Sequence, residues 1–195
     1  MQSSLTRPTN GNVGTIVFDL ESNGLLKRAS RIHCMALHWC SDNLTETFND
    51  ENYSEDAKSL PMGSNSITTA ISFLETADIV VGHNIIGFDL PLIKRLYNFF
   101  TYPPVIVDTL LLSRLYHPNL LDIDKKNQWQ DMPTNLYGSH SLEAYGYRLG
   151  ESKGDFGKTT DWSEWSQEMQ DYCKQDVIVT KKLCDHFHPY LIGSN

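Results

Sequence analysis

The chain has 195 residues, of which 40% are hydrophobic and 21% charged, and a formal net charge of -8. This composition is typical of one globular domain and excludes a wholly disordered chain, and no apolar run approaches the roughly 18 residues of a membrane span. The acidic balance argues against a tight, static nucleic-acid binder, which needs a basic surface. It permits an enzyme that handles nucleic acid through metal ions.

The first part of the chain predicts three neighbouring strands. Residues 1–14 are polar and are expected to form a flexible leader, followed by one domain over residues 15–191. Runs rich in β-branched and aromatic residues or with alternating polarity predict strands, and they lie at residues 15–21, 31–39 and 44–49. Because the links between them are short, these strands are expected to form an antiparallel meander.

The rest of the chain alternates helices with short strands. Strands are predicted at residues 78–82 and 105–108, and helices at 67–74, with Ser66 as N-cap, 90–99, 110–115, 141–149 and a long last helix capped by Ser163. The polar segments 122–139 and 151–161 are predicted to be loops. This order indicates a mixed sheet covered by helices. No G-x-G-x-x-G motif follows the first strand, which disfavours a dinucleotide-binding fold.

The four cysteines are expected to be reduced thiols. None of Cys34, Cys40, Cys173 and Cys184 forms a C-x-x-C pair, which argues against a zinc ribbon. Mostly buried, reduced thiols are typical of a cytoplasmic protein.

Two carboxylates stand two residues apart at the end of the first predicted strand. Side chains at that spacing in a strand project from the same face, so Asp19 and Glu21 would project together. A solvated strand end would show the same pattern, and the pair alone does not identify a site.

A third carboxylate follows the fourth predicted strand. Residues 82–89 read Gly-His-Asn-Ile-Ile-Gly-Phe-Asp, in which Asn84 and Gly87 suit a tight turn and Asp89 opens a helix. The helix dipole favours a carboxylate there. Asp89 is therefore either a helix cap or a ligand.

The last predicted helix carries a tyrosine and an aspartate on one face. Tyr172 and Asp176 are four residues apart, and the apolar Val179 and Leu183 share their face, which would point inward. A buried charge without a partner is costly, so a metal ion would suit Asp176. The alternative for Tyr172 is a core aromatic residue with a satisfied hydroxyl.

The combination is more specific than any one of these signals. Acidic residues occur in order on the first strand, on a strand-to-helix turn and on a late helix. Carboxylate oxygens suit Mg²⁺ or Mn²⁺, whereas zinc would favour histidine and cysteine. The pattern therefore predicts a divalent-cation site built from distant segments.

This pattern resembles the DEDD superfamily of 3′→5′ exonucleases. The matching segments are Phe-Asp-Leu-Glu ending at Glu21, Asn-x-x-x-Phe-Asp ending at Asp89, and Tyr-x-x-x-Asp ending at Asp176. The tyrosine marks the DEDDy branch, and Asp171 stands where the sister branch would place a histidine. Residues 108–120 and 139–150 look like the proofreading domain of family A DNA polymerases from short-tailed bacteriophages.

The resemblance implies both a fold and a reaction. The fold is α/β and ribonuclease-H-like: a mixed five-stranded sheet, an antiparallel meander followed by parallel strands, flanked by helices. The reaction is hydrolysis of the terminal phosphodiester at a 3′ end, with release of nucleoside 5′-monophosphates and two divalent cations, Mg²⁺ or Mn²⁺, as cofactors.

The resemblance also assigns roles to the acidic residues. Asp19 would bridge both ions, Glu21 and Asp176 would complete the site of the ion that activates water, and Asp89 would help to hold the second ion. Tyr172 would orient the attacking water, because a phenol is a poor general base near neutral pH.

Substrate-binding residues are expected around these motifs. Leu25 lies where the family places an apolar wedge beside the terminal base, with Asn84 and Phe88 near the same nucleotide and Arg148 as the favoured phosphate contact. The alternatives are core or rim packing for Leu25 and Phe88 and an ordinary solvated charge for Arg148.

The expected partners are single-stranded DNA or frayed 3′ ends, and a DNA polymerase or replication factor. A monomer in the cytoplasm, or in the host cytoplasm for a phage protein, is expected. Two other functions fit the sequence: an RNA-directed DEDDy exonuclease, and a non-catalytic docking module with the same fold. The chain could be a free-standing exonuclease or one domain of a longer polymerase.

Overall fold

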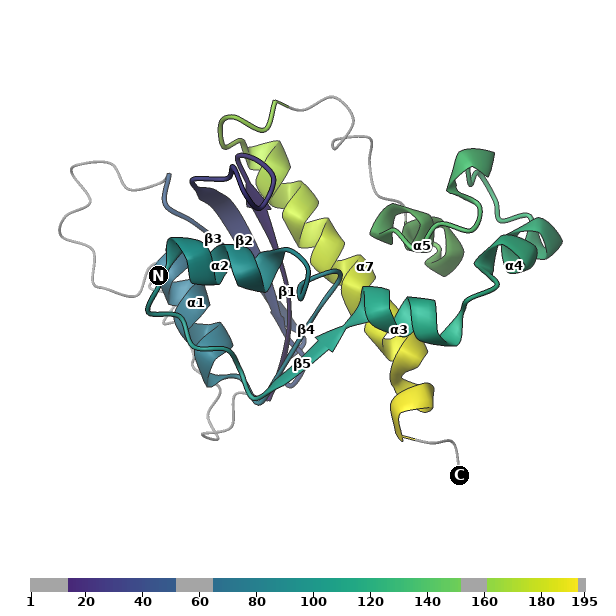
Figure 1. Cartoon of the computed structure of the whole chain (residues 1–195), viewed down its shortest axis with the longest axis horizontal. Coiled ribbons are helices and arrows are strands. Elements are labelled where there is room, and N and C mark those ends of the chain that lie inside the picture. The colour runs from purple at the N-terminus through teal and green to yellow at the C-terminus, as the bar shows by residue number, and fades with distance from the viewer. Residues whose placement is uncertain (1–13, 52–64, 152–160, 193–195) are drawn as a thin grey trace.

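A five-stranded mixed sheet forms the centre of the molecule in the computed structural model, which describes residues 14–51, 65–151 and 161–192 (Figure 1). The strand order is β3-β2-β1-β4-β5. The strands are β1 (Thr15–Ser22), β2 (Ile32–Trp39), β3 (Leu44–Asn49), β4 (Ile79–Gly82) and β5 (Val105–Asp108). The first three are antiparallel neighbours, whereas β4 pairs in parallel with β1, and β5 with β4. This confirms the predicted meander and mixed sheet.

Strand β1 occupies the middle of the sheet and is covered on both faces. Its even-numbered residues, such as Phe18 and Leu20, belong to a core that includes α1 (Ile67–Thr76) and α2 (Asp89–Leu96). Its odd-numbered Val17 belongs to a second core with α7 (Gln167–Ile192). Figure 1 shows α1 and α2 on one side of the sheet and α7 on the other. Asp19 and Glu21 therefore project from the face that α7 covers.

The remaining helices form a third packing region beside α7 (Figure 1). They are α3 (Thr109–Tyr116), α4 (Leu120–Asn127), the 3₁₀ turn η2 (Thr134–Leu136) and α5 (Leu142–Leu149). Leu120, Tyr145 and Leu183 are among the buried side chains that join these helices to α7. Helix α7 thus contacts both the sheet and this helical region.

The predicted N-cap of α1 is confirmed. The Ser66 hydroxyl accepts a hydrogen bond from the Thr69 N–H at 3.1 Å. Helix α5 is capped at its start by Ser141 and ends at Gly150, which adopts the left-handed conformation with φ of 68° that favours glycine.

Two predicted helix boundaries are wrong by about three residues, whereas the others agree within about two. Helix α7 begins at Gln167 and not after Ser163, because the Ser166 hydroxyl accepts the Met169 N–H at 3.1 Å and so caps it. Helix α2 ends at Leu96 and not at residue 99. Beyond it the chain turns back, and the Lys94 ammonium donates to the carbonyls of Asn98 and Phe100 at 2.9 and 2.7 Å.

The segment 122–139, predicted as a loop, contains most of α4 and the η2 turn. The helix is short and polar, and its two buried residues are Leu120 and Asp124. Leu120 packs against the α5–α7 region, and Asp124 pairs with Arg148 of α5. Long-range contacts therefore stabilise a helix that the local composition does not favour.

Other predictions fall partly outside the described residues. The predicted leader lies outside them except for Gly14, whose N–H donates to the Asp78 carboxylate. Residues 152–160 of the second predicted loop also lie outside them. The four cysteines are free thiols. None of the helices in the described part of the chain combines the length and apolarity that crossing a bilayer requires.

Candidate active site

Three carboxylates from two distant segments meet on the α7 face of the sheet. One oxygen each of Asp19, Glu21 and Asp176 lies within 4.8 Å of the others. Asp19 and Glu21 lie side by side because alternate residues of β1 share a face, and Asp176 reaches them from α7. The Cys173 thiol, one turn before Asp176, donates to the Asp19 carbonyl at 3.5 Å and fixes the helix against the strand. The structure thus brings together three of the four predicted carboxylates.

Like charges this close repel one another, and in a partly buried site the repulsion is weakly screened. Asp19 and Glu21 are half-buried, and Asp176 is only 7% exposed. Such a group requires a cation or a proton to balance its charge. All the donors are hard oxygens, so the residues present fit Mg²⁺ or Mn²⁺.

The fourth predicted carboxylate, Asp89, lies beside this group. It is the first residue of α2, after the cap position at Phe88, and is 4% exposed. Burial raises its pKa to about 7, and the charge of Asp108 adds to the effect. Hydrogen bonds with its own backbone and with that of Leu20 oppose the shift. The contact with Leu20 places Asp89 next to the strand segment between Asp19 and Glu21.

A tight turn holds Asp89 in this place. Asn84 has a positive φ of 66°, and its carbonyl accepts the N–H groups of Gly87 and Phe88, each at 3.0 Å. A Cβ at residue 87 would lie 2.6 Å from the Asn84 side-chain oxygen, so any other residue there would require the Asn84 side chain to move. The predicted turn is therefore confirmed.

Asp108 anchors the same turn and was not identified as a site residue from the sequence. Its carboxylate accepts the backbone N–H of Asn84 at 2.9 Å and that of Ile86 at 3.1 Å. It also caps α3 by accepting the Leu110 N–H at 2.9 Å. Its position in the sequence could have suggested this role. Asp108 ends a predicted strand, and the carboxyl ends of parallel strands lie at one edge of a sheet, so this position lies near the turn that follows β4.

Tyr172 lies one turn before Asp176 on α7 and is half-buried. The Trp162 ring packs against it edge to face, with ring centroids 6.4 Å apart. The Trp162 carbonyl lies 3.1 Å from His33 Nε2 of β2. These contacts connect the tyrosine side of the site to the sheet.

The predicted substrate-binding residues have different environments. Leu25 is 79% exposed in the turn after β1, a large apolar side chain left in solvent. Asn84 is exposed, whereas Phe88 is half-buried and packs against the core under α2.

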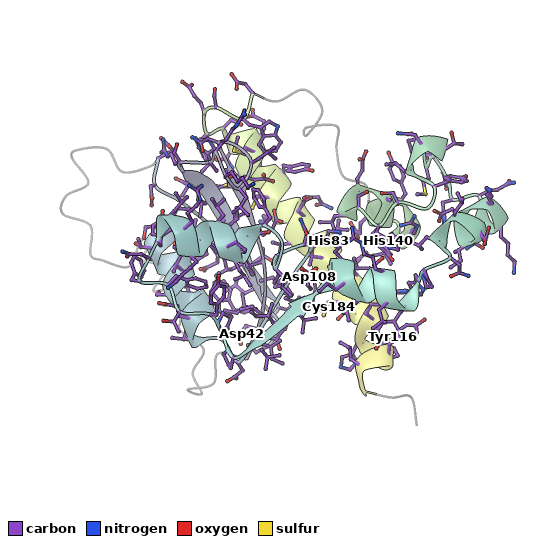
Figure 2. The ribbon with its side chains drawn as sticks, in the orientation of Figure 1. Asp42, His83, Asp108, Tyr116, His140 and Cys184 are labelled. Atoms are coloured by element: carbon purple, nitrogen blue, oxygen red, sulfur yellow. The ribbon has the colours of Figure 1, made fainter. Side chains whose placement is uncertain are left out.

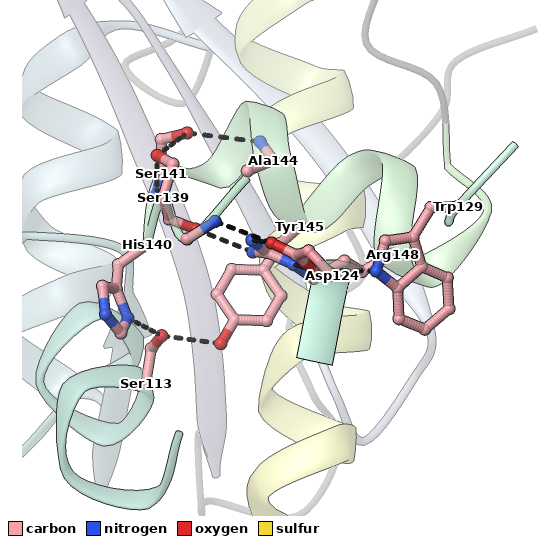
Figure 3. Close-up of polar contacts among 10 residues, drawn as sticks. Ser113, Asp124, Trp129, Ser139, His140, Ser141, Ala144, Tyr145 and Arg148 are labelled. Carbon is pink, nitrogen blue, oxygen red and sulfur yellow. Dashed lines mark hydrogen bonds and ion pairs between the residues drawn. The ribbon is translucent and has the colours of Figure 1, made fainter. Parts of the chain in front are cut away.

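Arg148 lies in a buried ion pair, which the sequence did not predict (Figure 3). Its guanidinium donates to both Asp124 carboxylate oxygens, at 2.9 and 2.7 Å, and to the Ser139 carbonyl at 2.8 Å. The Arg148 side chain is 5% exposed and that of Asp124 is fully buried. This environment favours a structural role over the predicted phosphate contact.

Hydroxyls of α3 hold two histidines near the motifs. Thr109 lies 2.9 Å from His83 Nδ1, and Ser113 lies 2.6 Å from His140 Nδ1 (Figures 2 and 3). Ser113 also contacts the Tyr145 hydroxyl at 2.6 Å. Both histidines are hydrogen-bonded within the fold.

Comparisons with known proteins agree with this architecture. The sequence profile of the RNase_H_2 family, from the RNase_H superfamily, matches residues 16–188. The chain is 30% identical over 192 residues to the DNA-directed DNA polymerase of Enterobacteria phage T3, and 31% identical over 193 residues to that of Escherichia phage T7. Each alignment covers 87% of this chain but only 26% of the polymerase.

Solved structures share the fold at lower identity. Brucella melitensis NrnC with bound Mg²⁺ has a TM-score of 0.60 and 19% identity, covering 96% of this chain and 78% of that one. A zinc-bound complex of E. coli ExoI with ssDNA has a TM-score of 0.52 and 17% identity, covering 91% of this chain and 41% of that one. These likenesses establish a common fold.

Proposed function

Because this chain belongs to the RNase_H_2 family of the RNase_H superfamily, we propose that it is a metal-dependent 3′→5′ exonuclease. It would hydrolyse terminal phosphodiesters of single-stranded or frayed DNA and release nucleoside 5′-monophosphates. The observation that carries the proposal is the convergence of Asp19, Glu21 and Asp176 within 4.8 Å, with Asp89 beside them.

The four carboxylates are the proposed ligands of two divalent cations, Mg²⁺ or Mn²⁺. Asp19 is central, Glu21 and Asp176 complete one side, and Asp89 serves the other. Two such cations stabilise the attacking and leaving oxygens of an in-line displacement and lower the pKa of bound water. Four negative charges are balanced by two divalent cations, which is consistent with an acidic site in a protein that acts on a polyanion.

The protein's own groups orient the reactants. The Tyr172 hydroxyl, one helical turn from Asp176, would hold the attacking water by a hydrogen bond. Asp108 acts as a positioning residue because it holds the turn that carries Asp89. The anchored strand, turn and helix fix the carboxylates before substrate arrives, which lowers the reorganisation that the reaction requires.

The terminal nucleotide would bind beside the end of β1. Leu25 is exposed enough to pack against a base, and Asn84 and Phe88 lie in the turn that leads to Asp89. Such contacts tolerate any base sequence, because every base has an apolar face. The proposed substrate is therefore a single strand, whatever its base sequence.

The similarity to phage DNA polymerases supports DNA as the substrate and proofreading as the context. The chain spans 26% of the length of those relatives. A DNA polymerase or replication factor is thus the proposed partner.

The test uses one oligonucleotide labelled at its 5′ end in one reaction and at its 3′ end in another. With Mg²⁺ or Mn²⁺, we expect a ladder of shortening products from the 5′ label and a labelled mononucleotide from the 3′ label. A chelator should stop both. Products that show the opposite polarity, or activity that persists in chelator, would refute the proposal. A matched RNA strand shows whether the 2′-hydroxyl is accepted.

Asp19→Ala should abolish this hydrolysis while leaving the far-UV circular dichroism spectrum unchanged. Asp171→Ala is the matched control, because it removes an exposed carboxylate from α7, five residues from Asp176. Comparable turnover by the two variants would exclude Asp19 from the reaction. Absence of activity in the intact protein would favour the non-catalytic docking module.

A further inference from the structure

Two histidines face each other on the side of α7 that packs against α3. His117 caps the C-terminal end of α3, and His186 lies in the last turns of α7. Their Nε2 atoms are 2.8 Å apart, and their ring centroids are 5.1 Å apart. Neither residue belongs to the acidic site or to the three motifs that define it.

The close contact means that one imidazole donates a proton and the other accepts it through a lone pair. Since His117 Nε2 faces His186, Nδ1 is the nitrogen left for the hydrogen bond with the Tyr116 backbone. Metal-binding histidines in proteins usually donate their second nitrogen to such a group, which fixes the tautomer that has a lone pair on the other nitrogen. His117 is therefore already oriented as a metal ligand would be.

Both rings favour their neutral form. Burial lowers the pKa of His117, and the nearby charge of His186 lowers it further, followed in effect by Arg148 and His140, while the Tyr116 backbone opposes the shift. Partial burial also lowers the pKa of His186. A neutral imidazole is the form that binds a metal ion.

Aromatic rings hold the two histidines in place. The Phe187 centroid lies 5.3 Å from that of His117 and 5.1 Å from that of His186. Tyr190 adds contacts at 5.8 and 6.4 Å. One side of the pair is thus packed, while His186 remains exposed to solvent. Water molecules or a small anion could approach a bound ion from that open side.

We propose that His117 and His186 form a two-imidazole site for a divalent transition-metal ion of the zinc class. Two nitrogens bound at about 2.0–2.1 Å in tetrahedral geometry lie roughly 3.3 Å apart, so the pair needs to open by only about 0.5 Å. Imidazole nitrogen suits Zn²⁺, Ni²⁺ and Cu²⁺, whereas Mg²⁺ prefers oxygen. The ion would join the end of α3 to α7, the helix that carries Tyr172 and Asp176.

The test measures Zn²⁺ binding to the full chain in which Asp19→Asn and Asp176→Asn weaken the acidic site. Titration calorimetry should show one Zn²⁺ ion per chain. Nitrogen-15 spectra of the histidine side chains should show the Nε2 resonances of His117 and His186 moving with Zn²⁺ at constant pH. Neither measurement depends on nuclease activity, so failure here is distinguishable from failure of the proposed function.

Substitution identifies the ligands. In that background, His117→Gln or His186→Gln should each weaken Zn²⁺ binding at least about tenfold, as loss of one of two ligands requires. His188→Gln is the matched control: it changes an exposed histidine two residues along α7 and should leave the affinity unchanged. Circular dichroism checks that each variant is folded.

The proposal is overturned if Zn²⁺ leaves both Nε2 resonances unmoved, and in that case the pair only shares a proton. It is also overturned if the folded Gln variants bind Zn²⁺ as tightly as their parent. The spectra of the parent protein decide the question even if a variant fails to fold.

Discussion

Arg148→Met tests whether the arginine of α5 stabilises the fold or binds substrate. The change keeps the apolar stem and removes the guanidinium, which makes three hydrogen bonds and lies over the Tyr145 ring at 4.8 Å. Asp124 would then keep a charge in a fully buried position, and its remaining donors among the described residues would be the Trp129 and Gly138 N–H groups.

Arg148→Met is expected to lower the free energy of unfolding substantially. Removing one partner of a buried ion pair typically destabilises a protein by 3–5 kcal/mol, and we expect about 3 kcal/mol because two donors to Asp124 remain. For a chain of this size that corresponds to a fall in the melting temperature of roughly 6–12 °C. Urea unfolding gives the free energy, and differential scanning calorimetry gives the melting temperature. Arg114→Met, at an exposed position of α3, is the matched control and should change stability by less than about 0.5 kcal/mol.

The destabilisation should also depend on pH. Burial acts to raise the pKa of Asp124, but hydrogen bonds from Arg148, Gly138 and Trp129 outweigh it and hold that pKa below its ordinary value. A lowered folded-state pKa contributes stability above the unfolded pKa of about 3.9, and this stability is lost as the pH falls through the lower folded value. The difference in unfolding free energy between wild type and Arg148→Met should therefore be largest near neutral pH and become smaller in acid.

A second substitution separates pairing from packing. Combining Asp124→Leu with Arg148→Met removes both charges, and replacing a buried pair with apolar residues is often neutral. The double variant should recover most of the lost stability. If Arg148→Met unfolds like wild type but raises the KM for single-stranded DNA, the ion-pair argument is wrong and the phosphate contact predicted from the sequence is supported.

Three further predictions concern the site itself. Tyr172→Phe should slow single-turnover hydrolysis by less than Asp19→Ala does, because only the orientation of water is lost; an unchanged rate would contradict that role. Asp108→Asn should lower stability by about 1–3 kcal/mol, since hydrogen bonds to a charged acceptor are lost, and should weaken Mn²⁺ binding because the turn before Asp89 loosens. If Asp108→Asn and wild type had the same urea midpoint and the same Mn²⁺ affinity, this prediction would be refuted. Leu25→Ala should leave the melting temperature unchanged, because the side chain is 79% exposed, while kcat/KM on a single strand falls; an unaltered kcat/KM would place Leu25 outside the substrate site.

The local sequence is enough to predict which of the site residues share a face of a strand or helix. Alternation along β1 places Asp19 and Glu21 on one face, and helical spacing places Tyr172 beside Asp176. Both rules follow from backbone geometry and need no knowledge of distant residues. The Asn84–Gly87 turn is similar, because the positive φ of Asn84 is a conformation that asparagine tolerates within the turn itself.

The hydrogen-bond partners of Arg148, Asp124 and Asp108 follow from tertiary structure. From the sequence, Arg148 is a positively charged residue in a predicted helix and could bind phosphate. Its partner Asp124 becomes evident only from the position of α4 in the fold. Asp108 resembles an ordinary helix cap until the parallel pairing of β5 with β4 brings it to the turn before Asp89. Helix α4 itself was missed because its stability comes from these same contacts. Backbone periodicity is a property of neighbouring residues, whereas the partner of a buried charge depends on which distant segments pack together.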